Sequence, residues 1–387
     1  MGLLDGIRVL DLSRVLAGPY AGQLLADMGA DVIKIEPPEG DPARGIGPHI
    51  DGRSLYFSAL NSNKRGIVLD LTTDAGQEAF GALLADADIL LENLRPAAAR
   101  RLGLEPASLL ERRPELVVVS ISGYARDSAW SEVPALDLTA QAETGIMSVT
   151  GEPGGPPVRA GVPVGDLAAG MWAAMAALAG TIDRLRTGRG RAIEVPLIDA
   201  TLTLTSYVAT AAAHTGEDPP PVGSGHHSVV PYRAYPAADG WVVIAVIGDR
   251  FWPALTAALE LDEAAFDGLD LARNVARHEH REVVDDAVVE ALSRLTVEEV
   301  CRRLADAGVP HAPVNGMVDA LATPYVAAQG VVAEVETPQG PYRTVRGPLN
   351  DGRAIRPAPG LGEHTAEVLR DLSEPRAPSR PTGFRSR

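Results

Sequence analysis

Cysteine is almost absent from this chain. One cysteine among 387 residues cannot form a disulfide within the chain, so the sequence excludes a disulfide-stapled scaffold and is typical of a reducing compartment. That residue, Cys301, lies in the helical-looking stretch TVEEVCRRLADAG, where a cysteine usually packs as a small hydrophobic residue. The N-terminal MGLLDGIRVLDLS has no long apolar segment, and Gly6 stands where a myristoylation signal needs Ser or Thr. The sequence therefore predicts a cytoplasmic protein.

Positive charge is scarce as well. The chain carries 35 Lys and Arg against 51 Asp and Glu, a net charge of -16, which opposes binding to nucleic acid or to an anionic membrane surface. The longest uncharged apolar run, residues 167–182, is shorter than a bilayer span and rich in Ala and Gly, so we expect a buried helix and no membrane association. An anionic ligand would have to meet a local cluster of cations.

Two familiar motifs are missing. The segment LAGPYAG after the first apolar run does not match the glycine-rich dinucleotide fingerprint, which disfavours an NAD enzyme. His278 and His280 in RHEHR are two residues apart and would not share a helix face, so we expect no metal site.

What the sequence does contain is an alternation of short β-branched runs with helical stretches. In order along the chain these are IRVLDLS, GPYAGQLLADMG, DVIKIEPP, GIVLDLTT, DAGQEAFGALLADA, DILLENL and LVVVSIS. This order is typical of an α/β domain with a mostly parallel sheet.

The pattern changes after the first half of the chain. We expect a large α/β domain over residues 1–205, a linker over 206–224 that is dense in Pro and Gly, and a small domain over 225–325. In the small domain, YRAYPAADGWVVIAV predicts a hairpin with its turn at Asp239-Gly240. Three helices should follow, over about Asp249 to Leu259, Val275 to Leu295, and Thr296 to Ala307.

The stretch GVPVGDLAAGMWAAMAALAG places one carboxylate, Asp166, between two apolar runs. Its position predicts a helix N-terminus, where Asp is a favoured capping residue and where backbone N–H groups would keep the carboxylate ionised. Gly161, Gly165 and Gly170 would let a ligand approach the backbone closely. These features permit nucleophilic attack on an activated carbonyl, but they do not require it.

Five motifs that occur in order carry a family resemblance. They are IRVLDLSRVLAGPYAGQLLADMGADVIKIEPPEGD, LNSNKRGIVLDL, ADILLENLRPAAARRLGL, VGDLAAGMWAAMAALAG and RTGRGRAIEVPLIDA. Over residues 1 to about 205 the chain resembles the class III coenzyme A transferases, a family of formyl-CoA transferase-like proteins that also contains the α-methylacyl-CoA racemases. From about residue 223 onward, where GSGHHSVVPYRAYPAADGW begins, the resemblance is looser.

The resemblance implies a function and a site. Asp166 would attack the carbonyl of an acyl-CoA, form a mixed anhydride, and become an aspartyl-CoA thioester that passes CoA to a second carboxylic acid. Residues implied to bind CoA are Arg14, Val15, Ala17, Asn93, Leu94, Arg101 and Leu102. Gly223, Gly225 and His226 would form a substrate loop. Acyl-CoA would be a substrate, with no permanently bound cofactor.

The resemblance also implies an architecture. It predicts a Rossmann-like large domain, completed by the C-terminal segment from about residue 330 to 387, and a smaller α+β domain. Two such chains would form an interlocked homodimer. Weaker candidates for the coenzyme phosphates are Lys64, Arg65 and Arg44, whereas the group Arg95, Arg100 and Arg101 follows a strand end, where ligands of open α/β sheets bind.

Two alternatives remain open. Racemases carry Gly-His-Asp where this chain reads Ala135-Leu136-Asp137, and Glu where Gly248 stands, so both acid/base partners are missing here. A noncatalytic CoA-binding protein, in which Asp166 only caps its helix, is the second alternative. Leu16 and Pro38 replace the Gln and Arg of formyl-CoA transferase, which argues against formate and oxalate as substrates.

Overall fold

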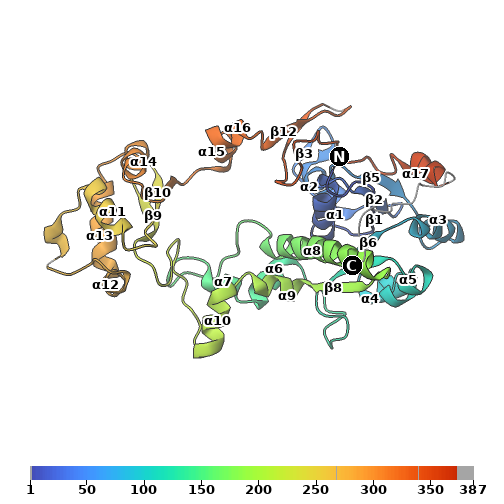
Figure 1. The fold of residues 1–387 in the computed structure, drawn as a ribbon, viewed down its shortest axis with the longest axis horizontal. Helices are drawn as coiled ribbons and strands as arrows, with labels where there is room; N and C mark the ends of the chain where they lie inside the picture. The colour runs from blue at the N-terminus through green and yellow to red at the C-terminus, as the bar shows by residue number, and fades with distance from the viewer. Residues whose placement is uncertain (1, 267, 339, 373–387) are drawn as a thin grey trace. The chain divides into compact units, whose positions relative to one another are not determined.

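The computed structural model describes residues 2–266, 268–338 and 340–372, and its contacts divide the chain into two compact units (Figure 1). Unit 1 comprises Met1–Ile146, Arg159–Glu217 and Ala327–Arg387, and unit 2 comprises Met147–Val158 and Asp218–Val326. The expected linker over 206–224 is not all extended chain, because it begins with helix α10 (Ser206–Thr215).

Unit 1 is built on a six-stranded sheet in which every paired strand is parallel. Its strands are β1 (Arg8–Asp11), β2 (Asp31–Glu36), β5 (Arg65–Val68), β6 (Ile89–Glu92), β7 (Val117–Ser122) and β8 (Ala192–Pro196). They lie in the order β5-β2-β1-β6-β7-β8, so the chain builds outward from β1 in one direction and then from β6 in the other. This confirms the predicted parallel α/β sheet, and ligands of such sheets bind where the order reverses, outside the carboxyl ends of β1 and β6.

Helices cover both faces of the sheet because neighbouring strand residues point in opposite directions. Val9 belongs to a buried cluster with α1 (Ala17–Asp27) and α8 (Val164–Thr187), to which α6 (Asp137–Glu143) and α9 (Leu197–Thr203) also contribute. Leu10 belongs to the opposite cluster. The helices that contribute to this second cluster are α3 (Asp74–Ala85), α4 (Pro96–Arg101), α5 (Pro106–Arg112) and α17 (Thr365–Asp371).

The helices α1 and α8 approach each other closely at Gly170. A Cβ atom added at Gly170 would lie 2.7 Å from the carbonyl oxygen of Ala17 and 2.9 Å from Cδ1 of Tyr20. This close approach explains why α8 is rich in Ala and Gly. The helix is longer than the apolar run suggested and has the length and apolar composition of a membrane span, and half of its most apolar window is buried. The predicted buried helix is therefore confirmed only in part, because one row of its apolar side chains is exposed.

Unit 2 has its own core around an antiparallel sheet of β9 (Tyr232–Pro236), β10 (Trp241–Ala245) and β11 (His311–Pro313). The predicted hairpin is therefore correct. Its helices are α11 (Phe251–Leu259), α12 (Asn274–Glu279), α13 (Arg281–Leu292) and α14 (Val297–Asp306). Helix α14 begins as expected, since the Thr296 side chain accepts a hydrogen bond from the backbone N–H of Glu299.

The single helix predicted over Val275 to Leu295 is wrong, because the chain leaves helical geometry at His280 and forms α12 and α13 instead. The sequence contains no breaker there. The cause is tertiary: the fully buried Arg277 donates to the carbonyl oxygens of Val230, Leu271 and Ala272 and to Asp249, which fixes α12 separately.

The remaining elements are short. In unit 1 they are η1 (Pro42–Gly45), β3 (His49–Ile50), β4 (Arg53–Ser54), α2 (Leu55–Asn61), β12 (Val332–Val335) and β13 (Tyr342–Val345). The others are α7 (Ile146–Val149), η2 (Glu263–Phe266), α15 (Met317–Leu321) and α16 (Pro324–Ala328).

The close packing of α1 and α8 generates a prediction. Gly170→Ala should lower the free energy of unfolding by about 1–3 kcal/mol, because the added methyl group must displace backbone of α1. Gly81→Ala is the matched control, because it also replaces a glycine in the middle of a helix. Apart from the adjoining residues and backbone of its own helix, the atom nearest to the new Cβ is Nη2 of Arg112 at 3.5 Å, an ordinary van der Waals contact. The control substitution should raise the free energy of unfolding by about 0.5–1 kcal/mol, because alanine favours the helix more than glycine does. Urea unfolding measures the free energy of unfolding of both variants. Equal changes in the two variants would contradict the close packing of α1 against α8 at Gly170.

Candidate active site

Two loops meet where the strand order reverses: residues 13–16 follow β1 and residues 93–95 follow β6. The Asn93 side chain joins them. Its Oδ1 accepts a hydrogen bond from the backbone N–H of Arg14, and its Nδ2 donates to the carbonyl oxygen of Arg14, both at 2.8 Å. The Asn93 amide is therefore already occupied with the neighbouring loop, and its role in binding CoA stays a prediction.

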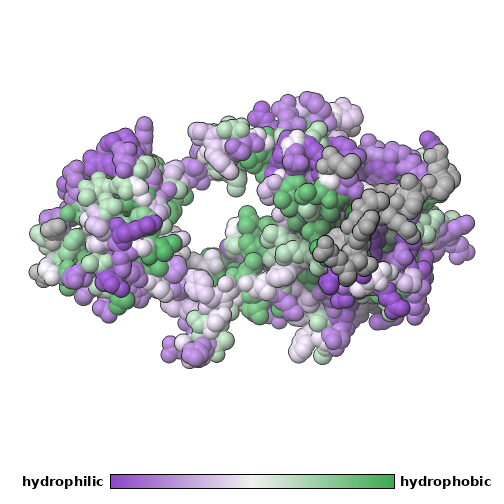
Figure 2. Space-filling model, in the orientation of Figure 1, coloured by the Kyte–Doolittle hydropathy of each residue, from purple (hydrophilic) through white to green (hydrophobic). Residues whose placement is uncertain are grey.

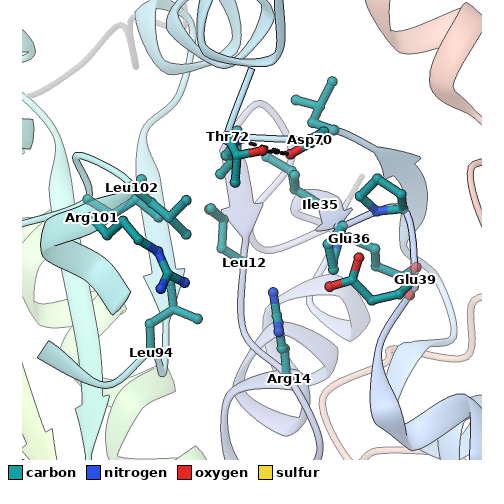
Figure 3. A pocket seen from close by; sticks show the side chains of 15 residues that line it. Leu12, Arg14, Ile35, Glu36, Glu39, Asp70, Thr72, Leu94, Arg101 and Leu102 are labelled. Atoms are coloured by element: carbon teal, nitrogen blue, oxygen red, sulfur yellow. Dashed lines mark hydrogen bonds between the residues drawn. The ribbon is translucent and has the colours of Figure 1, made fainter. Parts of the chain in front are cut away.

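Cavities lie on both sides of this junction, and Arg14 and Leu94 line both of them. The first, of about 320 Å³, contains Asp166. Predicted site residues that line it are Arg14, Val15, Ala17, Asn93, Leu94 and Asp166. The second, of about 350 Å³, contains Arg14, Leu94, Arg101 and Leu102 (Figure 3). The structure thus gathers in unit 1 all of the predicted coenzyme residues and the predicted nucleophile.

The second cavity is lined by apolar side chains, by two arginines and by the carboxylate residues Glu36, Glu39 and Asp70. Leu12 just after β1 and Ile35 of β2 line it, and the side chains of Arg14, from the loop after β1, and Arg101, from the end of α4, line it as well (Figure 3). Such a combination suits a heterocycle with nearby phosphates, because Arg is favoured for phosphate recognition.

Glu36 stands at the end of β2, where dinucleotide-binding sheets of this strand order place a carboxylate that binds a ribose. Here the Glu36 carboxylate is occupied. It accepts hydrogen bonds from Nε and Nη2 of Arg44 at 2.8 and 2.6 Å and from the backbone N–H of Asp41 at 2.9 Å. This occupation agrees with the missing dinucleotide fingerprint.

Asp166 is the third residue of α8, and the capping position belongs to Pro163. The expectation that Asp166 caps its helix is therefore wrong. Asp137 takes that role: its Oδ1 accepts a hydrogen bond from the backbone N–H of Gly165 at 2.9 Å, and its Oδ2 accepts one from Gln141 at 2.7 Å. The carboxylate of Asp166 accepts no hydrogen bond from the residues that the structure describes, which leaves it free for a ligand.

Burial, reinforced by the negative charge of Asp137, raises the pKa of Asp166 to about 6. The direction is opposite to the effect expected from a helix N-terminus, because loss of water around the carboxylate outweighs the N–H groups. At pH 7 the group is still mostly ionised, but it is a stronger base and nucleophile than an ordinary aspartate.

Tyr56 from α2 is a group that the sequence did not indicate. Burial, followed by the charges of Asp166, Asp41 and Asp137, raises the pKa of its phenol to about 12. The hydroxyl therefore remains protonated and can donate a hydrogen bond near Asp166. No spacing in the sequence signals this, since residues 56 and 166 meet only through the fold.

The weaker coenzyme candidates are each paired with carboxylates inside the protein, so their role toward the coenzyme stays a prediction. Lys64 is buried and donates to Asp11, to Asn61 and to the carbonyl oxygen of Pro19. Arg65 pairs with Asp31, Glu367 and Asp371, and Arg44 pairs with Glu36. Of the predicted arginine group, Arg101 lines the second cavity, Arg95 lines the first, and Arg100 pairs with Glu105 on the surface.

The predicted substrate loop lies in unit 2. Gly223 has φ +59° and donates its N–H to the carbonyl oxygen of Gly151, and Gly225 donates to that of Val222. These two N–H groups are thus already used within unit 2. Burial lowers the pKa of His226, which packs edge-on against Tyr232. Its role, and that of both glycines, toward a substrate stays a prediction.

The position of the racemase histidine is occupied by an aliphatic side chain. Leu136 lines the cavity that contains Asp166, and the neighbouring Asp137 is buried and hydrogen-bonded. A second acid/base group is therefore not supplied at this position. Among the described residues, no three His, Cys, Asp or Glu side chains group as metal ligands.

The electrostatic coupling generates a prediction. Asp137→Asn should shift the midpoint of Asp166 ionisation below about pH 6, because the amide keeps an acceptor for Gly165 but removes the negative charge. The measurement is a ¹³C NMR titration of labelled aspartates, with Asp166→Asn identifying the resonance. Asp183→Asn, which removes a carboxylate elsewhere on α8, is the control and should leave the midpoint unchanged. An unchanged midpoint in Asp137→Asn would show that burial alone raises the pKa.

Comparisons with known proteins agree with this geometry. The family model for CoA-transferase family III matches residues 4–365. The succinate–glutarate CoA-transferase of Agrobacterium fabrum is 36% identical over 382 residues, which cover 95% of each chain. The succinyl-CoA:mesaconate CoA-transferase of Haloarcula hispanica is 36% identical over 388 residues, covering 95% of this chain and 96% of the relative.

The fold agrees with a solved structure as well. A CAIB/BAIF family protein from Brucella suis is 33% identical and superimposes with a TM-score of 0.85 over 96% of this chain and 100% of its own. With a parallel sheet, a cleft at its switch point and a family match over nearly the whole length, this chain belongs to CoA-transferase family III and is a transferase enzyme.

Proposed function

We propose that this enzyme transfers CoA from an acyl-CoA to a carboxylic acid through covalent intermediates on Asp166. The observation that carries the proposal is the state of that carboxylate: it is half-buried in a cavity, unpaired among the described residues, and has a pKa of about 6. A structural aspartate would have a hydrogen-bonding partner, as Asp137 has.

The chemistry proceeds through four acyl transfers. The Asp166 carboxylate attacks the thioester carbonyl of the donor and expels CoA thiolate, which gives a mixed anhydride. The thiolate then attacks the aspartyl carbonyl, releasing the donor acid and leaving an aspartyl-CoA thioester. The acceptor carboxylate attacks that thioester, which gives a second anhydride and free thiolate. The thiolate finally attacks the acceptor carbonyl, forms the new acyl-CoA and restores Asp166.

Each step develops negative charge on a carbonyl oxygen, and two groups near Asp166 can stabilise it. Helix α1 begins at Ala17 in the same cavity, and its first N–H groups have no partner within the helix and no side-chain cap. The protonated hydroxyl of Tyr56 is a second donor in the neighbourhood of Asp166.

The two adjoining cavities support one orientation of bound CoA. If the thioester lies at Asp166, the rest of CoA passes Arg14 and Leu94 into the second cavity, where Arg14 and Arg101 can contact its phosphates. The local cations offset the repulsion that a net charge of -16 would otherwise impose on this anion.

For the acyl group we propose a short dicarboxylic acid, with succinyl-CoA as donor. The support comes from two relatives at 36% identity. One is named as a succinate–glutarate CoA-transferase and the other as a succinyl-CoA:mesaconate CoA-transferase.

We further propose the interlocked homodimer. Unit 1 exposes a row of apolar side chains on α8 that a monomer would leave in water, formed by Met171, Trp172, Met175, Ile182 and Leu185, each at least 40% exposed. Hydrophobic residues gather over the region of α8 (Figure 2). Apolar patches of this kind mark protein interfaces.

The covalent step is tested by intact-protein mass spectrometry after brief incubation with succinyl-CoA. We expect a hydroxylamine-sensitive CoA adduct on the Asp166 peptide, absent in Asp166→Ala and retained in the control Asp183→Ala, which alters the far end of the same helix. CoA binding without any adduct would contradict the mechanism. Exchange of the α-proton of a 2-methylacyl-CoA in heavy water without an acceptor acid would point to the racemase alternative, and binding without either activity to the CoA-binding protein.

The assembly is tested by sedimentation at decreasing protein concentration. We expect a dimer that persists at nanomolar concentration, because interlocked chains must partly unfold to separate. Met175→Glu should reduce the yield of dimer by placing a charge in the apolar row, whereas Met317→Glu, at another exposed methionine, should not. Folded monomers of the natural protein on simple dilution would contradict the proposal.

A further inference from the structure

Val15 has a backbone conformation that its side chain disfavours. Its φ is +68°, in the left-handed region, where a β-branched residue is a genuine outlier. It lies in the loop after β1 and lines the cavity that contains Asp166. Such conformations persist only when the surrounding structure holds them, and they concentrate at functional sites.

Asp41 holds this residue in place. Its Oδ1 accepts a hydrogen bond from the backbone N–H of Val15 at 3.1 Å and another from Ala43 at 2.9 Å. Its Oδ2 pairs with Nζ of Lys34 at 2.8 Å, and the same Nζ donates to the carbonyl oxygen of Ser13 at 3.0 Å. One carboxylate and one ammonium group thus connect β2 and η1 with the loop that leads into the strained residue.

Both charges are buried: Lys34 is 0% exposed and Asp41 is 3% exposed. A buried ion pair of this kind rarely adds net stability compared with apolar side chains, so its presence calls for another explanation. The backbone N–H of Asp41 is itself held by Glu36, which leaves the carboxylate little freedom to move.

The neighbours of Val15 are anchored independently. Arg14 is bound through its backbone to Asn93, and the N–H of Ser13 donates to Asp11. Among the described residues, Asp41 is the residue that accepts the hydrogen bond of the Val15 N–H. The Val15 N–H belongs to the peptide between Arg14 and Val15, whose carbonyl oxygen accepts a hydrogen bond from Asn93. Without Asp41 the N–H side of this peptide loses its hydrogen bond, next to Leu16, the residue from which α1 begins.

We propose that Asp41, itself oriented by Lys34, is a positioning residue for the coenzyme. It maintains the left-handed conformation of Val15, and thereby sets the direction in which the first loop and the N-terminus of α1 meet a bound acyl-CoA. This inference rests on the proposed function, because it concerns how the CoA thioester is held.

The test is a double-mutant cycle that measures CoA binding by calorimetry and kcat and KM with succinyl-CoA. Asp41→Ala should weaken CoA binding and raise KM about tenfold. Glycine adopts positive φ without penalty, so in a Val15→Gly background the same Asp41→Ala change should weaken binding by no more than about threefold. Asp41→Asn, which keeps an acceptor for Val15 but loses the charge that pairs with Lys34, provides a milder variant with a smaller loss in the same direction.

Asp88→Ala is the matched control for stability. It removes a buried partner of Arg184 and of the Arg8 N–H at the amino end of β6, far from the loops at the carboxyl end. It should lower the melting temperature as Asp41→Ala does but leave CoA affinity unchanged. Equal losses of affinity from Asp41→Ala in the natural background and in the Val15→Gly background would overturn the proposal, as would normal binding by Asp41→Ala.

The two proposals fail in different ways. If the natural protein binds CoA and shows the cycle described above but forms no adduct on Asp166, the positioning role stands and the covalent mechanism is wrong. If an adduct forms and Asp41→Ala has unchanged affinity and KM, the mechanism stands and the positioning role is wrong. Failure of the natural protein to bind CoA would overturn both.

Discussion

The close approach of α1 and α8 at Gly170 is the constraint on which the site depends. Because Gly170 lies against the backbone of Ala17, the two helices approach closely at the ends where they begin. Asp166 on α8 and the first turn of α1 therefore line one cavity. A larger side chain at Gly170 would push α8 away from α1. It would thereby separate the Asp166 carboxylate from the N–H groups of α1 that can stabilise an oxyanion.

A second theme is how a strongly acidic chain accommodates an anionic ligand. Cations near the cleft are already paired with buried carboxylates, as in the ion pairs Lys64–Asp11 and Lys34–Asp41. Arg14 and Arg101 are the cations that line the second cavity. Within the described part of the chain, no cation offsets the burial of Asp166 among the causes of its raised pKa: burial raises it first, and the negative charge of Asp137 adds to the effect.

The sequence predicted the parts of the molecule that local patterns encode. Apolar runs gave the strands and helices of unit 1, and the motifs around residues 14, 93, 101 and 166 identified groups that the structure gathers around two cavities. Properties that depend on burial and on distant partners could not be predicted. Asp137 acts on Asp166 across 29 residues of sequence, and Asp166 acts on Tyr56 across 110. Neither the break at His280 nor the pairing of Lys64 with Asp11 has a local signal.

The inward-facing Glu36 separates this protein from others built on the same order of strands. A carboxylate that points out from the end of the second strand selects a nucleotide with free ribose hydroxyls, whereas here it is saturated by Arg44 and by the backbone of Asp41. Its orientation also keeps Asp41 fixed. A single side chain therefore both fills the position at which related sheets bind a ribose and fixes the residue that we propose to position the first loop, so a substitution at Glu36 would affect the two features together.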